Sequence, residues 1–338
     1  MEPIINNVIF KNDNNVNVKL IKHKFSEGFI RNHDNHEVMF RRISTYLINN
    51  KFIDGNIIDL GCWIGDNSIP WAMNLPMHTV YAIDPSPNNI NYIEEMVKEN
   101  NVMNIKTIQK AISDENEIIS TNECIDHCMF SKKKGGIIKI QSVTLDYLYS
   151  QNKIDKIAFM HLDVEGFESK VIKGSDKIIE LFKPIIAYEQ HLEIDNHREI
   201  SLHLFNRGYN IYLINEVLPG CRPDCRNFIA FQKNIKIELD EIHSSIGQNV
   251  LLSIFNWDYT YSFKANIYGT SMNNKIFQNV KSIEYDDKHI FCVNDNNYTK
   301  MVVIDKNKKW LYGKYLLGEI NLCKQNIINA YLTAQGII

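Results

Sequence analysis

Four ionisable side chains stand directly after two apolar segments of the chain. Asp163 and Glu165 follow the first segment, and Glu189 and His191 follow the second. Ligands of open α/β sheets bind outside the carboxyl ends of the strands, so strands at these segments would bring all four side chains to one edge. Carboxylates and a neutral imidazole at such an edge can accept a proton from a hydroxyl group. The pattern predicts a proton-transfer site, with Asp163 as the first candidate for the general base.

Each of these residues also has a structural interpretation. Asp163 and Glu165 precede a helix expected from Phe167, whose N-terminus would stabilise negative charge. A single histidine after a strand, such as His191, is more often a hydrogen-bonded structural residue, although it could titrate near neutral pH. His161 lies two residues before Asp163, and we interpret it as a wall of the pocket. The sequence leaves these alternatives open.

A turn after the first buried strand predicts a cofactor site. The apolar run that ends at Asp59 continues through Gly61 and Gly65 into a helix, for which Ser68 can act as N-cap. The next apolar strand ends in Asp84, about 20 residues after Gly65, where such folds place a carboxylate that binds a ribose. A nucleotide-like ligand is therefore expected, with a ligand-free βα turn as the alternative.

The spacing of the glycines narrows the choice of cofactor. In a dinucleotide fingerprint, G-x-G-x-x-G, the second and third glycines would stand where this chain has Trp63 and Ser68. An indole should obstruct a diphosphate, whereas S-adenosylmethionine carries no phosphate. We therefore predict S-adenosylmethionine, with Asp59 placed to interact with its ammonium group directly or through water.

Residues on either side of the turn complete the predicted cofactor site. Glu37 could approach the methionine end, although a solvated helix face explains it equally well. Ala111 and Ile112 follow the third strand and would flank the adenine, with ordinary core packing as the alternative. The predicted cofactor-binding residues are Glu37, Asp59, Gly61, Cys62, Trp63, Gly65, Asn67, Ser68, Asp84, Pro85, Ser86, Ala111 and Ile112.

Two kinds of metal site are compatible with the sequence, and neither is established by it. Asp163, Glu189 and a substrate diol could hold Mg²⁺, which prefers oxygen ligands. Two Cys-x-x-x-Cys pairs could hold a structural Zn²⁺, but they lack the two-residue spacing of zinc ribbons, and pairs with a three-residue spacing also occur by chance. These pairs are Cys124 and Cys128, with His127 between them, and Cys221 and Cys225.

Composition narrows the class of protein. The chain has 338 residues and a net charge of −3, which argues against broad binding to nucleic acid or membrane surfaces. No apolar stretch approaches the length needed to span a bilayer, and the N-terminus does not resemble a signal peptide. Seven cysteines suit reduced thiols in a cytoplasmic protein. The abundance of Asn, Ile and Lys is typical of AT-rich genomes, such as those of some viruses, protists and bacteria; a viral protein would act in the host cytoplasm.

The order of apolar segments predicts an α/β fold. Strands and helices alternate from residue 56 to residue 231, which indicates a mostly parallel sheet covered on both faces. The last two strands resemble a hairpin that closes the sheet, as in the seven-stranded, Rossmann-like class I methyltransferase architecture. The predicted strands are Ile57–Leu60, Val80–Ile83, Lys106–Gln109, Ile157–Leu162, Pro184–Tyr188, Tyr209–Leu213 and Phe228–Gln232. The predicted helices are Ser68–Met73, Pro87–Asn100, Phe167–Phe182, divided at Gly174, and His197–Asn206.

Three regions are expected along the chain. Residues 1–50 form a lead-in with a helix at Glu37–Leu47, residues 51–235 form the α/β domain, and residues 236–338 form a β-rich accessory region. A helix at Glu319–Thr333 would close the accessory region. This appendage could bind an acceptor glycan, mediate a homo-oligomer or shield the sheet edge. Its aromatic residues, which could stack on sugar rings or form a core, are Trp257, Tyr259, Tyr261 and Tyr268.

The run from Ile57 to Gln190 resembles the FkbM family of S-adenosylmethionine-dependent methyltransferases. Its departures from the family pattern are modest: Cys62-Trp63 replaces a usual Ala-Asn, and His161 stands where a lysine is common. The resemblance implies methylation of a hydroxyl group on a sugar or another small metabolite. The segments that carry it are residues 59–65 (DLGCWIG), 80–87 (VYAIDPSP), 110–114 (KAISD), 144–146 (TLD), 161–168 (HLDVEGFE) and 184–189 (PIIAYE).

We therefore expect an O-methyltransferase that acts on a sugar, glycan or related small molecule. The main alternative is a subunit or scaffold that binds S-adenosylmethionine or a nucleotide without catalysis and uses the C-terminal β region to bind a partner. A Rossmann oxidoreductase is a second alternative, which Trp63 and the missing glycines oppose.

Overall fold

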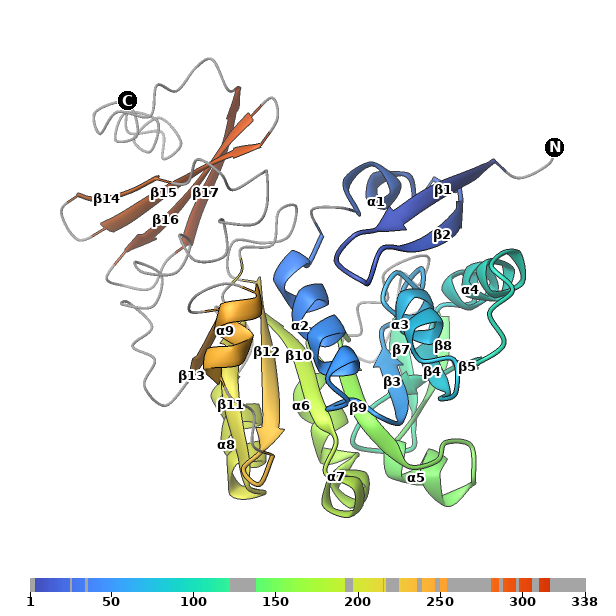
Figure 1. Ribbon diagram of the computed structural model, residues 1–338. Helices are drawn as coiled ribbons and strands as arrows, with labels where there is room; N and C mark the ends of the chain where they lie inside the picture. Colours follow the sequence, from blue (N-terminus) through green and yellow to red (C-terminus); the bar gives the residue numbers. More distant parts are fainter. Residues whose placement is uncertain are drawn as a thin grey trace.

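The centre of the molecule is an eight-stranded sheet with strand order β13-β11-β12-β10-β9-β3-β4-β5 (Figure 1). The computed structural model describes residues 4–24, 26–33, 36–121, 138–191, 197–214, 216, 225–235, 239–246, 250–253, 281–285, 288–295, 298–305 and 310–316. The strands of the central sheet are β3 (Asn56–Leu60), β4 (Val80–Asp84), β5 (Ile105–Gln109), β9 (Ile157–Leu162), β10 (Ile185–His191), β11 (Tyr209–Ile214), β12 (Cys225–Gln232) and β13 (Leu251–Ser253).

The sheet has the topology that the sequence predicts. Strands β5, β4, β3, β9 and β10 are parallel, and β12 runs antiparallel between β10 and β11. Apart from β13, this is the seven-stranded class I methyltransferase arrangement, so the predicted fold is confirmed. Strand β13 pairs with β11 and adds an eighth strand at that edge.

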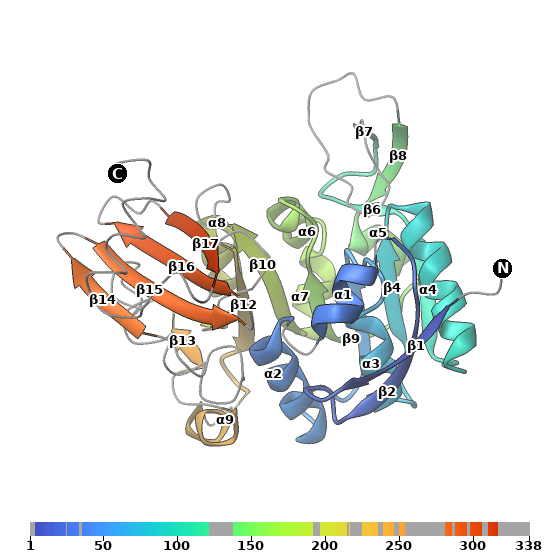
Figure 2. The same ribbon diagram turned by 90° about the horizontal axis from the view of Figure 1, so that it is seen from above.

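Helices cover both faces of the sheet, which explains why its strands are apolar runs without alternation. One apolar core lies between the sheet and helices α5–α8, and a second lies between its other face and α2–α4 and α9. Figure 2 separates these two layers, with α6 and α7 on one side and α2 and α3 on the other. The helices are α1 (Glu27–Asn32), α2 (Val38–Asn49), α3 (Ser68–Asn74), α4 (Pro87–Glu99), α5 (Leu145–Ser150), α6 (Glu168–Lys173), α7 (Asp176–Phe182), α8 (His197–Asn206) and α9 (Leu239–Ile246).

The predicted division of the third helix at Gly174 is confirmed. Helix α6 ends at Lys173 and α7 begins at Asp176. A Cβ atom at Gly174 would lie 2.1 Å from the carbonyl oxygen of Ser113, so only glycine permits this approach of the two backbones.

An N-terminal hairpin occupies part of the region expected to be a lead-in. Strands β1 (Ile5–Phe10) and β2 (Val16–Ile21) are antiparallel, and their inward side chains share the core of α2 and the sheet. Asn14 and Asn15 have φ angles of 57° and 56°, the left-handed backbone of a hairpin turn, which asparagine tolerates. The asparagine-rich segment near the N-terminus therefore forms the turn between two strands.

Two smaller sheets complete the described structure. One contains β6 (Ala111–Ile112), β7 (Ile118–Thr121) and β8 (Ile138–Val143), and Figure 2 shows β7 and β8 projecting from the body. The other is a four-stranded antiparallel sheet in the predicted β-rich region. Its strands are β14 (Lys281–Tyr285), β15 (Lys288–Asp295), β16 (Tyr298–Asp305) and β17 (Trp310–Leu316).

Some predictions fall outside the described residues. These include the helix at Glu319–Thr333 and the aromatic residues Trp257, Tyr259, Tyr261 and Tyr268. None of the helices in the ranges given above is both long enough and apolar enough to cross a bilayer.

Candidate cofactor and catalytic site

The turn between β3 and α3 has an unusual backbone. Gly61 and Gly65 have φ angles of +73° and +74°, and Trp63 between them has a φ of +41°. A Cβ atom at Gly61 would lie 1.7 Å from the carbonyl oxygen of Asp163, so glycine lets this turn lie directly against the chain that leaves β9. A left-handed conformation is rare for a bulky residue such as tryptophan and marks the turn as a candidate functional site.

Asp84 holds the turn from the end of β4. One carboxylate oxygen accepts a hydrogen bond from the backbone N–H of Trp63 at 3.2 Å, and the other accepts from the N–H of Ser86 at 2.7 Å. Burial raises the pKa of Asp84 to about 6. The side chain of Asn89 also hydrogen-bonds to Asp84, and since a carboxylate has about four lone-pair positions, these three bonds leave about one for a ribose hydroxyl.

The indole of Trp63 contacts helix α1. Its ring packs edge-on against Phe29, with 5.9 Å between the ring centroids. The side chain thus has a protein partner on the side of the N-terminal hairpin and α1, elements whose contribution the sequence analysis did not identify.

The carboxylate of Asp59 forms hydrogen bonds with two other side chains of the protein. Its carboxylate oxygens contact His161 Nδ1 at 2.8 Å and accept a hydrogen bond from the Ser68 hydroxyl. Burial disfavours a charged His161, but the hydrogen bond and charge of Asp59 outweigh burial and raise the pKa of His161. The predicted N-cap role of Ser68 is wrong, because α3 begins at Ser68 itself and its hydroxyl is directed to Asp59.

His161 lies beneath the site. Its ring stacks on Phe40 with 4.9 Å between centroids and meets Trp71 edge-on at 5.5 Å. Together with its bond to Asp59, this packing makes it a buried support for β3. The pocket-wall role predicted for it does not fit a ring that is 3% exposed.

Glu37 links three parts of the fold. At the start of α2, its carboxylate accepts hydrogen bonds from Nδ2 of Asn67 at 3.3 Å and from Nδ2 of Asn227, on β12, at 2.7 Å. Burial alone would raise the pKa of Glu37, but the positive charges of His36, His161 and Arg41 lower it to about 2. Glu37 is therefore ionised, and it lies next to the glycine turn through Asn67.

Two amide oxygens beside Glu37 are available to a ligand. Oδ1 of Asn67 and Oδ1 of Asn227 are buried and accept no hydrogen bond from the described residues. A buried acceptor without a donor is rare in folded proteins. An ammonium group bound between the glycine turn and α2 would supply the missing donors, so these residues fit the amino-acid end of S-adenosylmethionine.

A buried ion network that the sequence analysis missed fixes the same turn. The Arg41 guanidinium donates to the carboxylate of Asp66 at 2.5 Å and to its carbonyl oxygen at 2.9 Å, and lies 3.4 Å from Asp13. In the sequence, Arg41 belongs to the polar side of an amphipathic helix. Nothing in that pattern shows that the N-terminal hairpin covers it.

The structure brings the predicted catalytic carboxylates together. Asp163 follows β9, and its backbone N–H donates to the carbonyl oxygen of Leu60 at 2.9 Å. Burial and the nearby charges of Glu189, Glu165 and Glu37 raise the pKa of Asp163 well above its usual range. Glu165 is exposed, at a left-handed position of the loop.

Glu168 positions the loop that carries Asp163 and Glu165. One of its oxygens accepts hydrogen bonds from the N–H groups of Val164 at 3.0 Å and Gly166 at 3.2 Å. The other accepts from the Gln190 amide at 3.2 Å, which ties the loop to β10. The one signal in the sequence for this role is an acidic residue in the first turn of a predicted helix. Such a residue can accept hydrogen bonds from the N–H groups that precede it.

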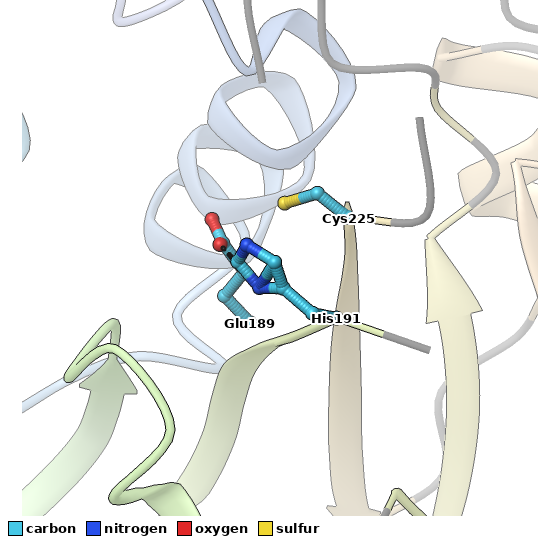
Figure 3. A group of neighbouring side chains, drawn as sticks. All are labelled: Glu189, His191 and Cys225. Atoms are coloured by element: carbon cyan, nitrogen blue, oxygen red, sulfur yellow. Dashed lines mark ion pairs between the residues drawn. The ribbon is translucent and has the colours of Figure 1, made fainter. Parts of the chain in front are cut away.

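The structure places only some of the predicted metal ligands near one another. Glu189, His191 and Cys225 lie on neighbouring strands β10 and β12, and Figure 3 shows them as one group. Asp163 belongs to neither of the two groups of metal-ligating side chains found among the described residues. The other cysteines of the predicted zinc site, Cys124, Cys128 and Cys221, lie outside the described ranges, as does His127.

The remaining predicted cofactor residues follow β3, β4 and β5 in the chain. Cys62 is buried, and burial with the nearby Asp84 and Asp59 raises the pKa of its thiol, which stays neutral. Pro85 and Ser86 lead into α4, where the Ser86 hydroxyl accepts from the N–H of Asn89. Ala111 and Ile112 are buried in β6. Contacts of these residues with an adenine or ribose remain predictions.

Part of the chain is similar in sequence to a known protein family. The sequence model described as the methyltransferase FkbM domain matches residues 64–211. No curated protein matched the chain. Among solved structures, the methyltransferase FkbM from Methylobacillus flagellatus KT is 15% identical, with a TM-score of 0.38 over 61% of this chain. The matching region spans 60% of that protein's length.

Two further solved structures are similar at the same level. A putative rRNA-methylase from Clostridium thermocellum is 10% identical over 57% of this chain and 94% of its own, with a TM-score of 0.37. The M. jannaschii protein TYW2, solved in complex with AdoMet, is 17% identical over 63% of this chain and 80% of its own, with a TM-score of 0.33.

Proposed function

We propose that the protein is an S-adenosylmethionine-dependent methyltransferase that methylates a hydroxyl group of a sugar, glycan or related small molecule, because residues 64–211 match the methyltransferase FkbM domain. One observation supports this most strongly. The left-handed glycine turn bound to Asp84 lies directly against the backbone of Asp163, so a cofactor site and a candidate base are adjacent.

Three groups of residues would hold the cofactor. Asp84 would accept hydrogen bonds from the ribose, and the oxygens of Asn67 and Asn227 would accept from the ammonium group. The ionised Glu37 lies beside both asparagines and favours a cationic ligand there. When bound, S-adenosylmethionine supplies a methyl group on a positively charged sulfur.

Asp163 would take the proton from the acceptor hydroxyl. A general base is most efficient when its pKa lies near the working pH, and the pKa of Asp163 is raised toward that range by burial and neighbouring carboxylates. Glu189 and His191 are the alternatives on β10. The loop bonds of Glu168 keep Asp163 in a fixed position, which in-line transfer requires.

Two substitutions separate cofactor binding from catalysis. We expect Asp84→Ala to weaken binding of S-adenosylhomocysteine by about 10–100-fold, because hydrogen bonds to a charged group are lost. We expect Asp163→Asn to leave that affinity within a few fold and to lower methyl transfer by about 10²–10⁴-fold. Isothermal titration calorimetry and transfer of labelled methyl groups to nucleotide sugars and polysaccharide fragments measure the two effects.

Three results would contradict the proposal in different ways. Tight binding of NAD⁺ without binding of S-adenosylhomocysteine would favour an oxidoreductase. Cofactor binding without transfer to any acceptor would favour a non-catalytic subunit. Equal loss of cofactor affinity in the Asp84 and Asp163 variants would show that their roles are misassigned.

A further inference from the structure

The backbone places three metal-ligating side chains on one face of the sheet. Glu189 and His191 are two residues apart on β10, so both project to the same side of the strand. Cys225 on β12 pairs directly with His191 in the antiparallel register, and directly opposed residues share a face. Asn227 pairs with Glu189 in the same way and binds Glu37, so this is the face covered by α2.

The side chains point toward one another (Figure 3). Glu189 Oε1 lies 3.6 Å from His191 Nδ1, and one ligand atom from each of the three residues lies within 4.8 Å of the other two. A tetrahedral zinc ion with ordinary bond lengths separates its ligands by about 3.3–3.7 Å. Small side-chain rotations would bring the three donors to those separations.

We propose that Glu189, His191 and Cys225 bind a transition-metal ion, with Zn²⁺ as the main candidate. Thiolate and imidazole ligands favour Zn²⁺ and related ions over Mg²⁺ and Ca²⁺, which prefer oxygen. The site differs from both metal sites predicted from the sequence, because it combines one residue of each with His191. Three protein ligands leave one coordination position open, as in catalytic zinc sites.

The charge of the surroundings favours a cation. Glu37 adds a carboxylate on the same face of the sheet, where it binds Asn227, the residue that pairs with Glu189. In a role that rests on the proposed function, the open position would bind an oxygen of the methyl acceptor next to Asp163.

Cobalt binding tests the site without reference to activity. Untagged full-length protein would be stripped with chelator and titrated with Co²⁺, which gives a near-ultraviolet charge-transfer band when bound to thiolate. We expect one equivalent of Co²⁺ per chain, displaced by Zn²⁺. Cys225→Ser should abolish the band, and His191→Ala should weaken binding by at least the about 10–100-fold that loss of a supporting residue costs a metal site.

Two matched variants control for unrelated thiols and imidazoles. Cys292→Ser changes a cysteine of β15 in a different sheet, and His203→Ala changes a histidine of α8 that pairs with Asp176. Both should retain the band and the affinity. If Cys225→Ser fails to fold by circular dichroism, His191→Ala alone decides between the outcomes.

The proposal is overturned if the wild-type protein binds no Co²⁺, or if the band persists unchanged in both Cys225→Ser and His191→Ala. Titration of the metal-free protein with S-adenosylhomocysteine separates this failure from failure of the proposed function. Cobalt binding without cofactor binding would count against the methyltransferase and leave the metal site standing. The reverse result would remove the metal site alone.

Discussion

At the scale of the residue, a carboxyl group is set apart by its surroundings rather than by its type. Glu37 is buried and Asp163 is half-buried, and the pKa of Glu37 is lowered to about 2 whereas that of Asp163 is raised. Glu37 lies near His36, His161 and Arg41, whereas Asp163 lies near other carboxylates. Glu37 is therefore held ionised, as the proposed binding of a cationic ligand requires, whereas Asp163 takes up a proton more readily than an ordinary aspartate.

The raised pKa of Asp163 has a consequence for the pH dependence of activity. A base must be deprotonated to act, so kcat/KM should fall as pH drops through the raised pKa of Asp163, well above the pH at which an ordinary aspartate is protonated. We expect Asp163→Asn to remove this acidic limb along with most of the activity. Initial rates over a pH series measure it.

Asp54→Asn is the matched control, because Asp54 is exposed and pairs with His78 away from the site. It should leave the acidic limb in place. An acidic limb that survives in Asp163→Asn would assign the base to another residue, with Glu189 and His191 next in order.

At the scale of the element, the close approach of the β3–α3 turn to the chain after β9 depends on one glycine. A Cβ atom at Gly61 would meet the Asp163 carbonyl oxygen at 1.7 Å, and its φ of +73° is unfavourable for other residues. We expect Gly61→Ala to lower the free energy of unfolding by about 3 kcal/mol or more, through steric overlap and backbone strain. Urea denaturation measures the change.

Gly28 in α1 gives the opposite expectation. A Cβ atom there has no neighbour within 4 Å, and alanine is a better helix former than glycine. Gly28→Ala should leave the protein as stable as before or stabilise it by up to about 1 kcal/mol. If Gly61→Ala lowers the free energy of unfolding no more than Gly28→Ala does, the turn tolerates displacement and the close approach is not essential.

The elements themselves were largely predictable, because each buried strand is a short apolar run bounded by turns. All seven predicted strands lie within two or three residues of the observed ones, and β9 begins and ends as predicted. The hairpin β1–β2 was missed because the asparagine-rich composition made its turn resemble a polar lead-in. Helix α5 is short and carries too little periodic pattern to be recognised.

At the scale of the whole molecule, the site depends on pairings that link distant parts of the sequence. Arg41 binds Asp66, Glu37 binds Asn227, and Glu216 accepts from the N–H groups of Met39 and Phe40. A sequence shows the residue types but not which of them meet. The acids at strand ends were found because parallel strands share an edge, whereas these supports needed the three-dimensional arrangement.

The buried carboxyl groups also set the pH dependence of folding. Burial raises the pKa of Asp13 and Asp84 to about 6 and that of Glu216 to about 7, and protonation of these groups is easier in the folded state. Their contribution to stability is present below the unfolded pKa values, near 4, and is lost as pH rises toward 7. Glu37 has the opposite sign and contributes above pH 4.5, with its contribution lost as pH falls toward 2.

We therefore expect the ligand-free protein to be most stable near pH 5 and to lose stability between pH 5 and pH 8. Glu216→Gln should flatten this decline, because the charged form of Glu216 alone costs about 3 kcal/mol above its folded pKa. The variant should lose less thermal stability than the wild type between pH 5 and pH 8, and it should start less stable at pH 5, because glutamine has one acceptor oxygen for the two backbone N–H groups. Thermal unfolding followed by circular dichroism across this range measures both, and a wild-type profile that rises from pH 5 to pH 8 would show that the buried acids are stabilised in their charged form.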